Sequence, residues 1–198
     1  ATNLNGLLAK GITSITDAQK TPEDYRRWQA VYAERALPLP RAKLQFEWDD
    51  PVAIKRLMQE VGDGDDWLAI GPIKIFVDGG FTGPAAYTLK PYRDQPDYRG
   101  YLNMAESKLV RQINEIHDAG LQMGIHAIGD EAIALVVDTL TETLQRSPRA
   151  DHRHYLNHFS MRPPADTMVK MAEQNIHITQ QPNFTYTLEG RYAVNLDG

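Results

Sequence analysis

The sequence contains no cysteine among its 198 residues. Disulfide scaffolds, thiolate metal sites and cysteine nucleophiles are therefore excluded. A chain without cysteine is consistent with a reducing compartment, and we expect a cytoplasmic location. The sequence also lacks an apolar run of the roughly 18 residues that a membrane-spanning helix needs, so we expect no membrane partner.

Positive charge is scarce as well. The 21 lysine and arginine residues are outnumbered by 26 acidic residues, and the net charge is −5. No basic run is present, so we expect no nucleic-acid partner. The sequence has no Gly-x-Ser-x-Gly motif, no phosphate-binding glycine loop and no dinucleotide fingerprint. These absences argue against serine hydrolases, nucleotide hydrolases and nicotinamide-dependent enzymes.

What the chain does contain is a regular alternation of short apolar runs and amphipathic segments. Strands are expected at 11–17, 44–48, 73–77, 121–127, 155–158 and 176–179. Helices are expected between them at 21–36, 51–61, 103–119, 130–144 and 163–175. Strict alternation predicts an α/β fold with a parallel sheet, either a barrel or a doubly wound sheet. No element is expected after the last strand, and both ends are interpreted as cut from a longer polypeptide.

One long connection, 81–101, follows a strand and precedes a helix. Parallel βα folds place their reactive residues at this end of the strands. We therefore interpret the connection as a candidate lid or substrate wall. Its four tyrosines suggest aromatic contacts, but the sequence identifies no substrate-binding residue.

Lys74 lies between Ile73 and Ile75 in an apolar predicted strand. A buried lysine has a lowered pKa, and its neutral amine can react. It can take up CO2 as a carbamate, which is an oxygen ligand for metals, or form a Schiff base with a carbonyl substrate. The alternative is a lysine that reaches solvent or pairs with Asp78.

His126 and His158 lie at equivalent positions, at the ends of the next two predicted strands. A neutral imidazole is a natural metal ligand, although a single packed histidine is more often structural. Two histidines at neighbouring strand ends converge on one point, and with a carbamate oxygen they form a three-ligand zinc site. We expect His117 to be a surface or packing residue, and His152 and His154 to be solvated or to make structural hydrogen bonds. His177 lies inside the last predicted strand, and one alternative is that it faces the site.

Several segments together resemble the amidohydrolase superfamily, in particular its YtcJ-like (amidohydrolase 3) branch, which includes N-substituted formamide deformylase. They are 11–18, 73–79, 126–130, 154–158 and Gln181-Pro182, and the His-Ala-Ile-Gly-Asp segment at 126–130 is the most specific. The resemblance covers nearly the whole chain. It implies a distorted (β/α)8 TIM-type barrel, of which residues 1–198 form a single catalytic piece, about strands 2 to 7. The flanking first and eighth strands and a β-sandwich domain are expected to be absent.

The resemblance also implies roles for five residues. Lys74 matches a carboxylated fourth-strand lysine that bridges two metals, and His126 and His158 match metal ligands of the fifth and sixth strands. Asp78 and Asp130 match positions that support the metal ligands without binding the metal themselves. The expected cofactor is a divalent metal, with zinc as the default and iron and manganese as alternatives, and with one or two ions in the whole protein. The expected activity is hydrolysis of a non-peptide C–N bond of a small amide-type substrate by metal-bound hydroxide.

The chain departs from the family pattern at several points. It has no first-strand His-x-His pair and no eighth-strand aspartate, and Tyr155 and Asn157 replace the Arg and Glu of the usual sixth-strand motif. We therefore expect that this chain alone binds at most one metal, weakly or not at all, and has little or no activity. Two alternatives stay open: a truncated barrel with a binding or structural role, and a Schiff-base lyase that uses Lys74. The open edges of such a barrel predict association into a homo-oligomer.

Overall fold

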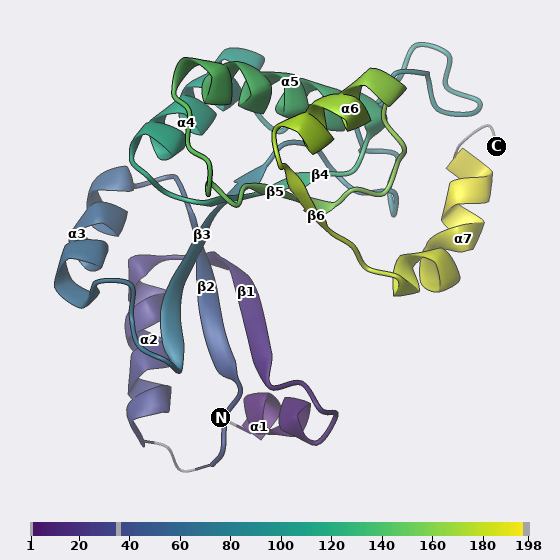
Figure 1. Cartoon of the computed structure of the whole chain (residues 1–198). Helices are drawn as coiled ribbons and strands as arrows, with labels where there is room; N and C mark the ends of the chain where they lie inside the picture. The colour runs from purple at the N-terminus through teal and green to yellow at the C-terminus, as the bar shows by residue number, and fades with distance from the viewer. Residues whose placement is uncertain (1, 35–36, 196–198) are drawn as a thin grey trace. The chain divides into compact units, whose positions relative to one another are not determined.

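The computed structural model describes residues 2–34 and 37–195. The chain divides into two compact units, Ala1–Lys74 and Ile75–Gly198 (Figure 1), and each is described by itself. In the described residues six strands follow one another in the sheet order β1-β2-β3-β4-β5-β6. The β1–β2, β2–β3, β4–β5 and β5–β6 ladders are all parallel. The predicted α/β alternation with a parallel sheet is confirmed.

The first unit begins with a short helix and continues with alternating strands and helices. Its elements are α1 (Thr2–Leu8), β1 (Ser14–Lys20), α2 (Pro22–Glu34), β2 (Arg41–Glu47), α3 (Pro51–Val61) and β3 (Leu68–Phe76), the last of which crosses into the second unit. Capping hydrogen bonds mark the starts of α2 and α3 close to the predicted positions. Thr21 and Asp24 each accept a hydrogen bond from the other's backbone N–H before α2. Asp50 accepts one from Ala53 at the start of α3.

Two strands of the first unit differ from the expected bounds. β1 begins three residues later than predicted, at Ser14, and Gln19 within it has a φ of +59°. β3 begins at Leu68, five residues earlier than predicted. Gly71 hides this early start in the sequence because glycine resembles a strand break. Here it serves a close approach instead, since a Cβ at this position would lie 2.7 Å from the carbonyl oxygen of Leu44.

The second unit carries the remaining strands and helices. They are α4 (Glu106–Asp118), β4 (Met123–Ala127), α5 (Asp130–Arg146), β5 (Tyr155–His158), α6 (Ala165–Glu173), β6 (His177–Thr179) and α7 (Asn183–Asn195). Helices α4, α5 and α6 lie together on one side of the three strands (Figure 1). Leu109, Ile113 and Ile116 of α4 are fully buried, as the helical periodicity predicts. All five residues of β4 are buried, which is typical of a parallel strand covered on both faces.

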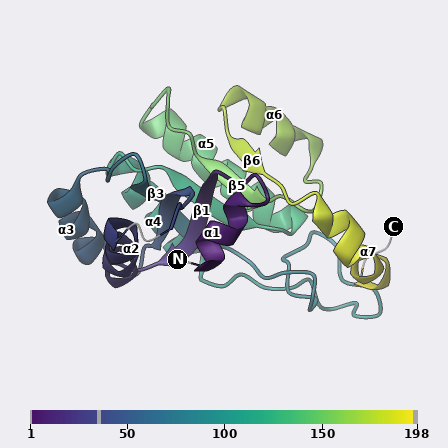
Figure 2. The same ribbon diagram turned by 90° about the horizontal axis from the view of Figure 1, so that it is seen from below.

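Helix α7 was not predicted. Its sequence has no apolar stripe, and Tyr186 and Val194 are largely exposed. The helix is held by tertiary hydrogen bonds, since the Arg93 guanidinium donates to the carbonyl of Ala193 over 2.7 Å and the Arg93 backbone N–H donates to Asn195 over 3.0 Å. The 81–101 connection therefore lies beside the end of α7 (Figure 2). Among the helices that the structure describes, none is both long and apolar enough to cross a membrane.

Candidate metal centre

The structure brings His126 and His158 together at the carboxyl ends of β4 and β5. Their ring centroids are 4.7 Å apart, and the rings meet edge to face at 70°. In the β4–β5 ladder, however, His126 pairs with Asn157 and His158 pairs with Ala127. Paired residues face the same side of a sheet, so regular alternation would place the two imidazoles on opposite faces.

A local change of backbone brings the two rings to the same place. His158 has a φ of +77° and Phe159 has a φ of +45°. Residues other than glycine seldom adopt this left-handed conformation, because their Cβ crowds the backbone. The Phe159 N–H donates to the carbonyl of Ala127 over 3.2 Å and keeps the turn against the neighbouring strand. The end of β5 thus stores strain of the kind that accumulates at functional sites.

His126 is deeply buried, with 7% of its surface exposed. Neither of its ring nitrogens has a hydrogen-bond partner among the described residues. Its Nε2 atom lies 3.4 Å from Oδ1 of Asp78, which is an ion-pair distance without hydrogen-bond geometry. A buried polar group without a partner costs about 1–3 kcal/mol. An imidazole left in this state suits a site where a ring nitrogen binds a ligand.

Asp78 organises the surroundings of His126. It is 1% exposed, and its carboxylate accepts backbone N–H groups from Ile128 (3.1 Å), Gly129 (2.8 Å) and Tyr87 (3.0 Å). These donors belong to the junction after β4 and to the 81–101 connection. A Cβ at Gly129 would clash with the carbonyl of Tyr87, so this close approach requires glycine. One carboxylate therefore faces His126 and fixes two segments beside it.

Asp130 holds the same connection at a second point. It is the first residue of α5, and its Oδ1 atom accepts the N–H of Leu89 over 2.9 Å and of Glu131 over 3.0 Å. The connection also has a small core of its own, with Phe81, Ala86, Tyr92 and Ile128. It is therefore a fixed wall rather than a loose loop, and the most buried of its tyrosines, Tyr92, belongs to its packing.

His158 has a partner that the sequence analysis did not assign. Nδ1 of His158 lies 2.7 Å from Oε1 of Gln181, and the Phe184 ring stacks on the imidazole with centroids 6.0 Å apart. The available signal was the pair of glutamines directly after the last predicted strand. Nothing in their spacing indicated that one of them reaches back to His158.

Lys74 belongs to the first unit and is described with it. The side chain lies in β3 and is 5% exposed. The predicted alternative of a lysine reaching solvent is therefore wrong. Burial lowers the pKa of Lys74 from 10.5 to about 8. A substantial fraction of the amine is then neutral near pH 8 and available for reaction.

The donor atoms of the second unit fit a divalent metal in part. His126 and His158 offer two adjacent imidazoles, and zinc accepts such nitrogen ligands. Within the described residues, no group of three or more histidine, cysteine, aspartate or glutamate side chains is arranged to hold a metal.

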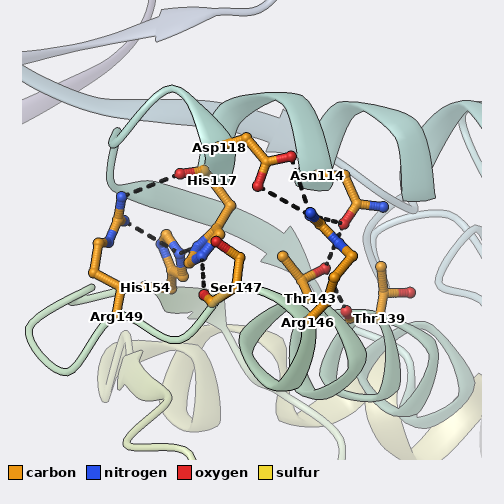
Figure 3. Close-up of polar contacts among 9 residues, drawn as sticks. All are labelled: Asn114, His117, Asp118, Thr139, Thr143, Arg146, Ser147, Arg149 and His154. Carbon is orange, nitrogen blue, oxygen red and sulfur yellow. Dashed lines mark hydrogen bonds and ion pairs between the residues drawn. The ribbon is translucent and has the colours of Figure 1, made fainter.

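A second group of histidines lies near the amino ends of β4 and β5 (Figure 3). His154 accepts the N–H of Met123 at Nδ1 over 3.1 Å, so its proton is on Nε2. This Nε2 atom lies 3.0 Å from Nδ1 of His117, whose own Nε2 donates to the carbonyl of Ser147 over 2.7 Å. The two imidazoles form one continuous hydrogen-bonded chain between two backbone groups.

His152 completes this group. Its Nδ1 accepts the N–H of His154 over 2.9 Å, and its Nε2 donates to the carbonyl of Gln174 over 2.7 Å. Burial, followed by the charge of nearby groups, lowers the pKa of His154 to about 2, and burial also lowers the pKa of His152. Of the two expectations for His152 and His154, solvation or structural bonding, the structure shows structural bonding. His177, inside β6, is exposed.

The comparison with known families decides where the chain belongs. A model of the amidohydrolase family matches residues 1–196. The chain belongs to the amidohydrolase family. Among curated proteins, this amidohydrolase chain is 31% identical to Protein LONG AFTER FAR-RED 3 of Arabidopsis thaliana over 93 residues, which cover 47% of the chain and 16% of that protein. It is 27% identical over 121 residues to YtcJ of Bacillus subtilis (strain 168), a protein named as an amidohydrolase, with 60% of the chain and 22% of that protein covered.

Solved structures agree on the fold. An uncharacterized metal-dependent hydrolase from Pyrococcus furiosus superimposes with a TM-score of 0.75 at 23% identity, over 94% of this chain and 38% of that one. A second, from Pyrococcus horikoshii OT3, gives a TM-score of 0.71 at 23% identity, over 91% and 35%. The predicted fold, part of a parallel barrel of the metal-dependent hydrolase kind, is confirmed. The chain spans less than half the length of each of these relatives.

Proposed function

We propose that this chain is part of a cytoplasmic, metal-dependent amidohydrolase that cleaves a C–N bond other than a peptide bond in a small amide-type molecule. The observation that carries the proposal is His126, which is buried without a hydrogen bond among the described residues and in ring contact with His158. Membership of the amidohydrolase family supplies the reaction class. Because the chain spans 22% of the YtcJ relative, the activity belongs to the whole protein.

His126 and His158 would hold the metal, which we propose to be zinc. Asp78 Oδ1 lies on the Nε2 side of His126. A carboxylate on that side favours a proton on Nε2 and leaves the Nδ1 lone pair for the ligand bond. A bound zinc ion activates water and polarises the substrate carbonyl. Asp78 and Asp130 keep the 81–101 wall in place beside this site.

Lys74 is the proposed third ligand, as a carbamate. Its assignment rests on its place in the family motif and on its own burial. With a pKa of about 8, the amine is neutral often enough to attack the carbon of CO2 and release a proton. The product is an anionic oxygen donor, and zinc accepts oxygen ligands of this kind.

The test measures zinc content and intact mass of the purified chain after incubation with zinc and bicarbonate. We expect at most one zinc ion per chain, with binding that is lost in His126→Ala and kept in the control His177→Ala, because His177 is an exposed histidine of β6. We expect an added mass of one CO2 that disappears in Lys74→Ala. Equal zinc in His126→Ala and wild type would contradict the site. A chain that takes up neither zinc nor CO2 would favour the binding or structural alternative.

A Schiff-base lyase is the second candidate, and the pKa of Lys74 favours it too, since a neutral buried amine also condenses with carbonyl compounds. The experiment is reduction with borohydride in the presence of small aldehydes and ketones. A covalent adduct that forms in wild type and is lost in Lys74→Ala would support the lyase. No adduct, together with a CO2-modified lysine, would leave the hydrolase as the proposed function.

A further inference from the structure

One contact determines the protonation pattern of the His158 ring. The Oε1 atom of Gln181 lies 2.7 Å from Nδ1 of His158. A carbonyl oxygen can accept a hydrogen bond but cannot donate one, so Nδ1 carries the proton and donates. In a neutral imidazole the lone pair is then on Nε2.

The segment that carries Gln181 is itself fixed. The Phe184 N–H donates to the carbonyl of Gln181 over 2.9 Å, which closes a turn at the start of α7. Gln180 donates from its side chain to the carbonyl of Phe159 over 2.9 Å. The Phe184 ring stacks on the His158 imidazole with an interplanar angle of 11°. The junction between β6 and α7 therefore restrains His158 at one ring nitrogen, on one ring face and through the backbone of the next residue.

We propose that Gln181 is a positioning residue of the metal centre, which selects the Nδ1–H tautomer of His158 and so presents the Nε2 lone pair to the metal. This inference rests on the proposed function, because it assigns His158 as a ligand. Outer partners of this kind fix the tautomer and the ring orientation, and their loss commonly lowers metal affinity by about 10–100-fold. The positive φ of His158 strengthens the need for such a partner, because a strained residue keeps its geometry only when its surroundings hold it.

The test reads the tautomer directly. Proton–nitrogen correlation spectra of the metal-free chain report which ring nitrogen of His158 carries the proton, and His158→Asn assigns the signals. Gln181→Leu removes the acceptor with little change in size, and we expect the His158 ring to lose its single Nδ1–H tautomer. Zinc affinity, measured by calorimetric titration, should fall by about 10–100-fold.

Two further variants make the test specific. Gln181→Glu keeps an acceptor oxygen and should keep both the tautomer and the zinc affinity. Gln180→Leu changes the neighbouring glutamine, which contacts the Phe159 carbonyl and not the imidazole, and should leave the tautomer unchanged. An unchanged tautomer in Gln181→Leu would overturn the inference whatever the zinc affinity. A changed tautomer in Gln181→Leu would support the positioning of His158 by Gln181 even if the chain binds no zinc. The absence of zinc binding would then count against the proposed function.

Discussion

Two groups of histidines lie at opposite ends of the same strands, and their hydrogen bonding differs. Near the amino ends of β4 and β5, the rings of His117, His152 and His154 each bond through both nitrogens to backbone groups or to one another. At the carboxyl ends, His126 has no hydrogen-bond partner at either nitrogen among the described residues. The His158 ring contacts the His126 ring, and the His158 backbone has the left-handed conformation.

The difference separates histidines that stabilise the fold from histidines that are held for a ligand. His126 is buried like His117, His152 and His154, so burial alone does not distinguish the groups. A ring with both nitrogens satisfied contributes to stability, and its removal leaves several buried groups without partners. A ring with an unpaired nitrogen lowers stability unless a ligand binds it, and natural proteins tolerate that cost mainly at functional sites.

The largest effect on stability is expected from a substitution in the fully hydrogen-bonded group of His117, His152 and His154. His154→Ala removes the acceptor of the Met123 N–H and the donor to His117, and it opens a cavity in a fully buried position. We expect a loss of about 3–5 kcal/mol in the free energy of unfolding, measured by urea denaturation. The exposed His177→Ala should change it by less than about 0.5 kcal/mol. A loss below about 1 kcal/mol for His154→Ala would contradict the structural role of His154.

Asp78→Asn tests the role of the buried carboxylate beside His126. In the wild type, the Asp78 carboxylate accepts hydrogen bonds from three backbone N–H groups. The asparagine amide has one acceptor oxygen, and its NH2 group is a donor that cannot accept from these N–H groups. We expect a loss of about 2–3 kcal/mol and faster proteolysis within 81–101. The matched control is Asp138→Asn on the exposed face of α5, where an ion pair with Lys170 is worth less than about 1 kcal/mol. Equal stability of the two variants would contradict the anchoring role of Asp78.

Acid should destabilise the folded chain through the buried, hydrogen-bonded histidines His152 and His154. Burial holds the pKa of His154 at about 2, below its ordinary value of 6.5, and also lowers the pKa of His152. The unfolded chain therefore binds more protons than the folded chain below pH 6.5, and stability falls as the pH drops from 6.5 toward 2. Each such group contributes a slope of up to about 1.4 kcal/mol per pH unit. Denaturation midpoints between pH 7 and 5 measure the slope, and an equally steep slope in His154→Gln would exclude this residue as a source.

The smallest effect is expected at His126, and its sign is opposite. His126→Leu replaces an unpaired buried imidazole with an apolar side chain of similar size. We expect the metal-free protein to keep its free energy of unfolding or to gain up to about 1 kcal/mol, measured by urea denaturation. Zinc binding should be lost in the same variant. A loss of more than about 1.5 kcal/mol would show that His126 is a structural histidine like His154.

Much of this architecture could be predicted from the sequence because periodicity and capping residues act locally. The apolar face of α4 and the cap at Asp50 are examples. Helix α7 could not be predicted, because a distant arginine holds it and no apolar stripe marks it. The early start of β3 was hidden by Gly71, whose role depends on the approach of a neighbouring strand.

The candidate site was predictable in its composition and not in its geometry. Strand-end position and apolar surroundings indicated Lys74, His126 and His158, and their roles as ligands stay predictions. The left-handed turn at His158 and the reach of Gln181 could not be predicted, since both depend on contacts over 23 residues or more. The carboxylates of Asp78 and Asp130 also accept backbone N–H groups from a connection whose conformation no local pattern indicates.

The most direct measurement of the difference between the two histidine groups is a zinc titration of the metal-free chain followed by the ring-nitrogen signals of its histidines. We predict that the signals of His126 and His158 shift as zinc binds, while those of His117, His152 and His154 stay in place. Signals of the amino-end group that shift with zinc, or signals of His126 and His158 that do not respond at saturating zinc, would contradict it.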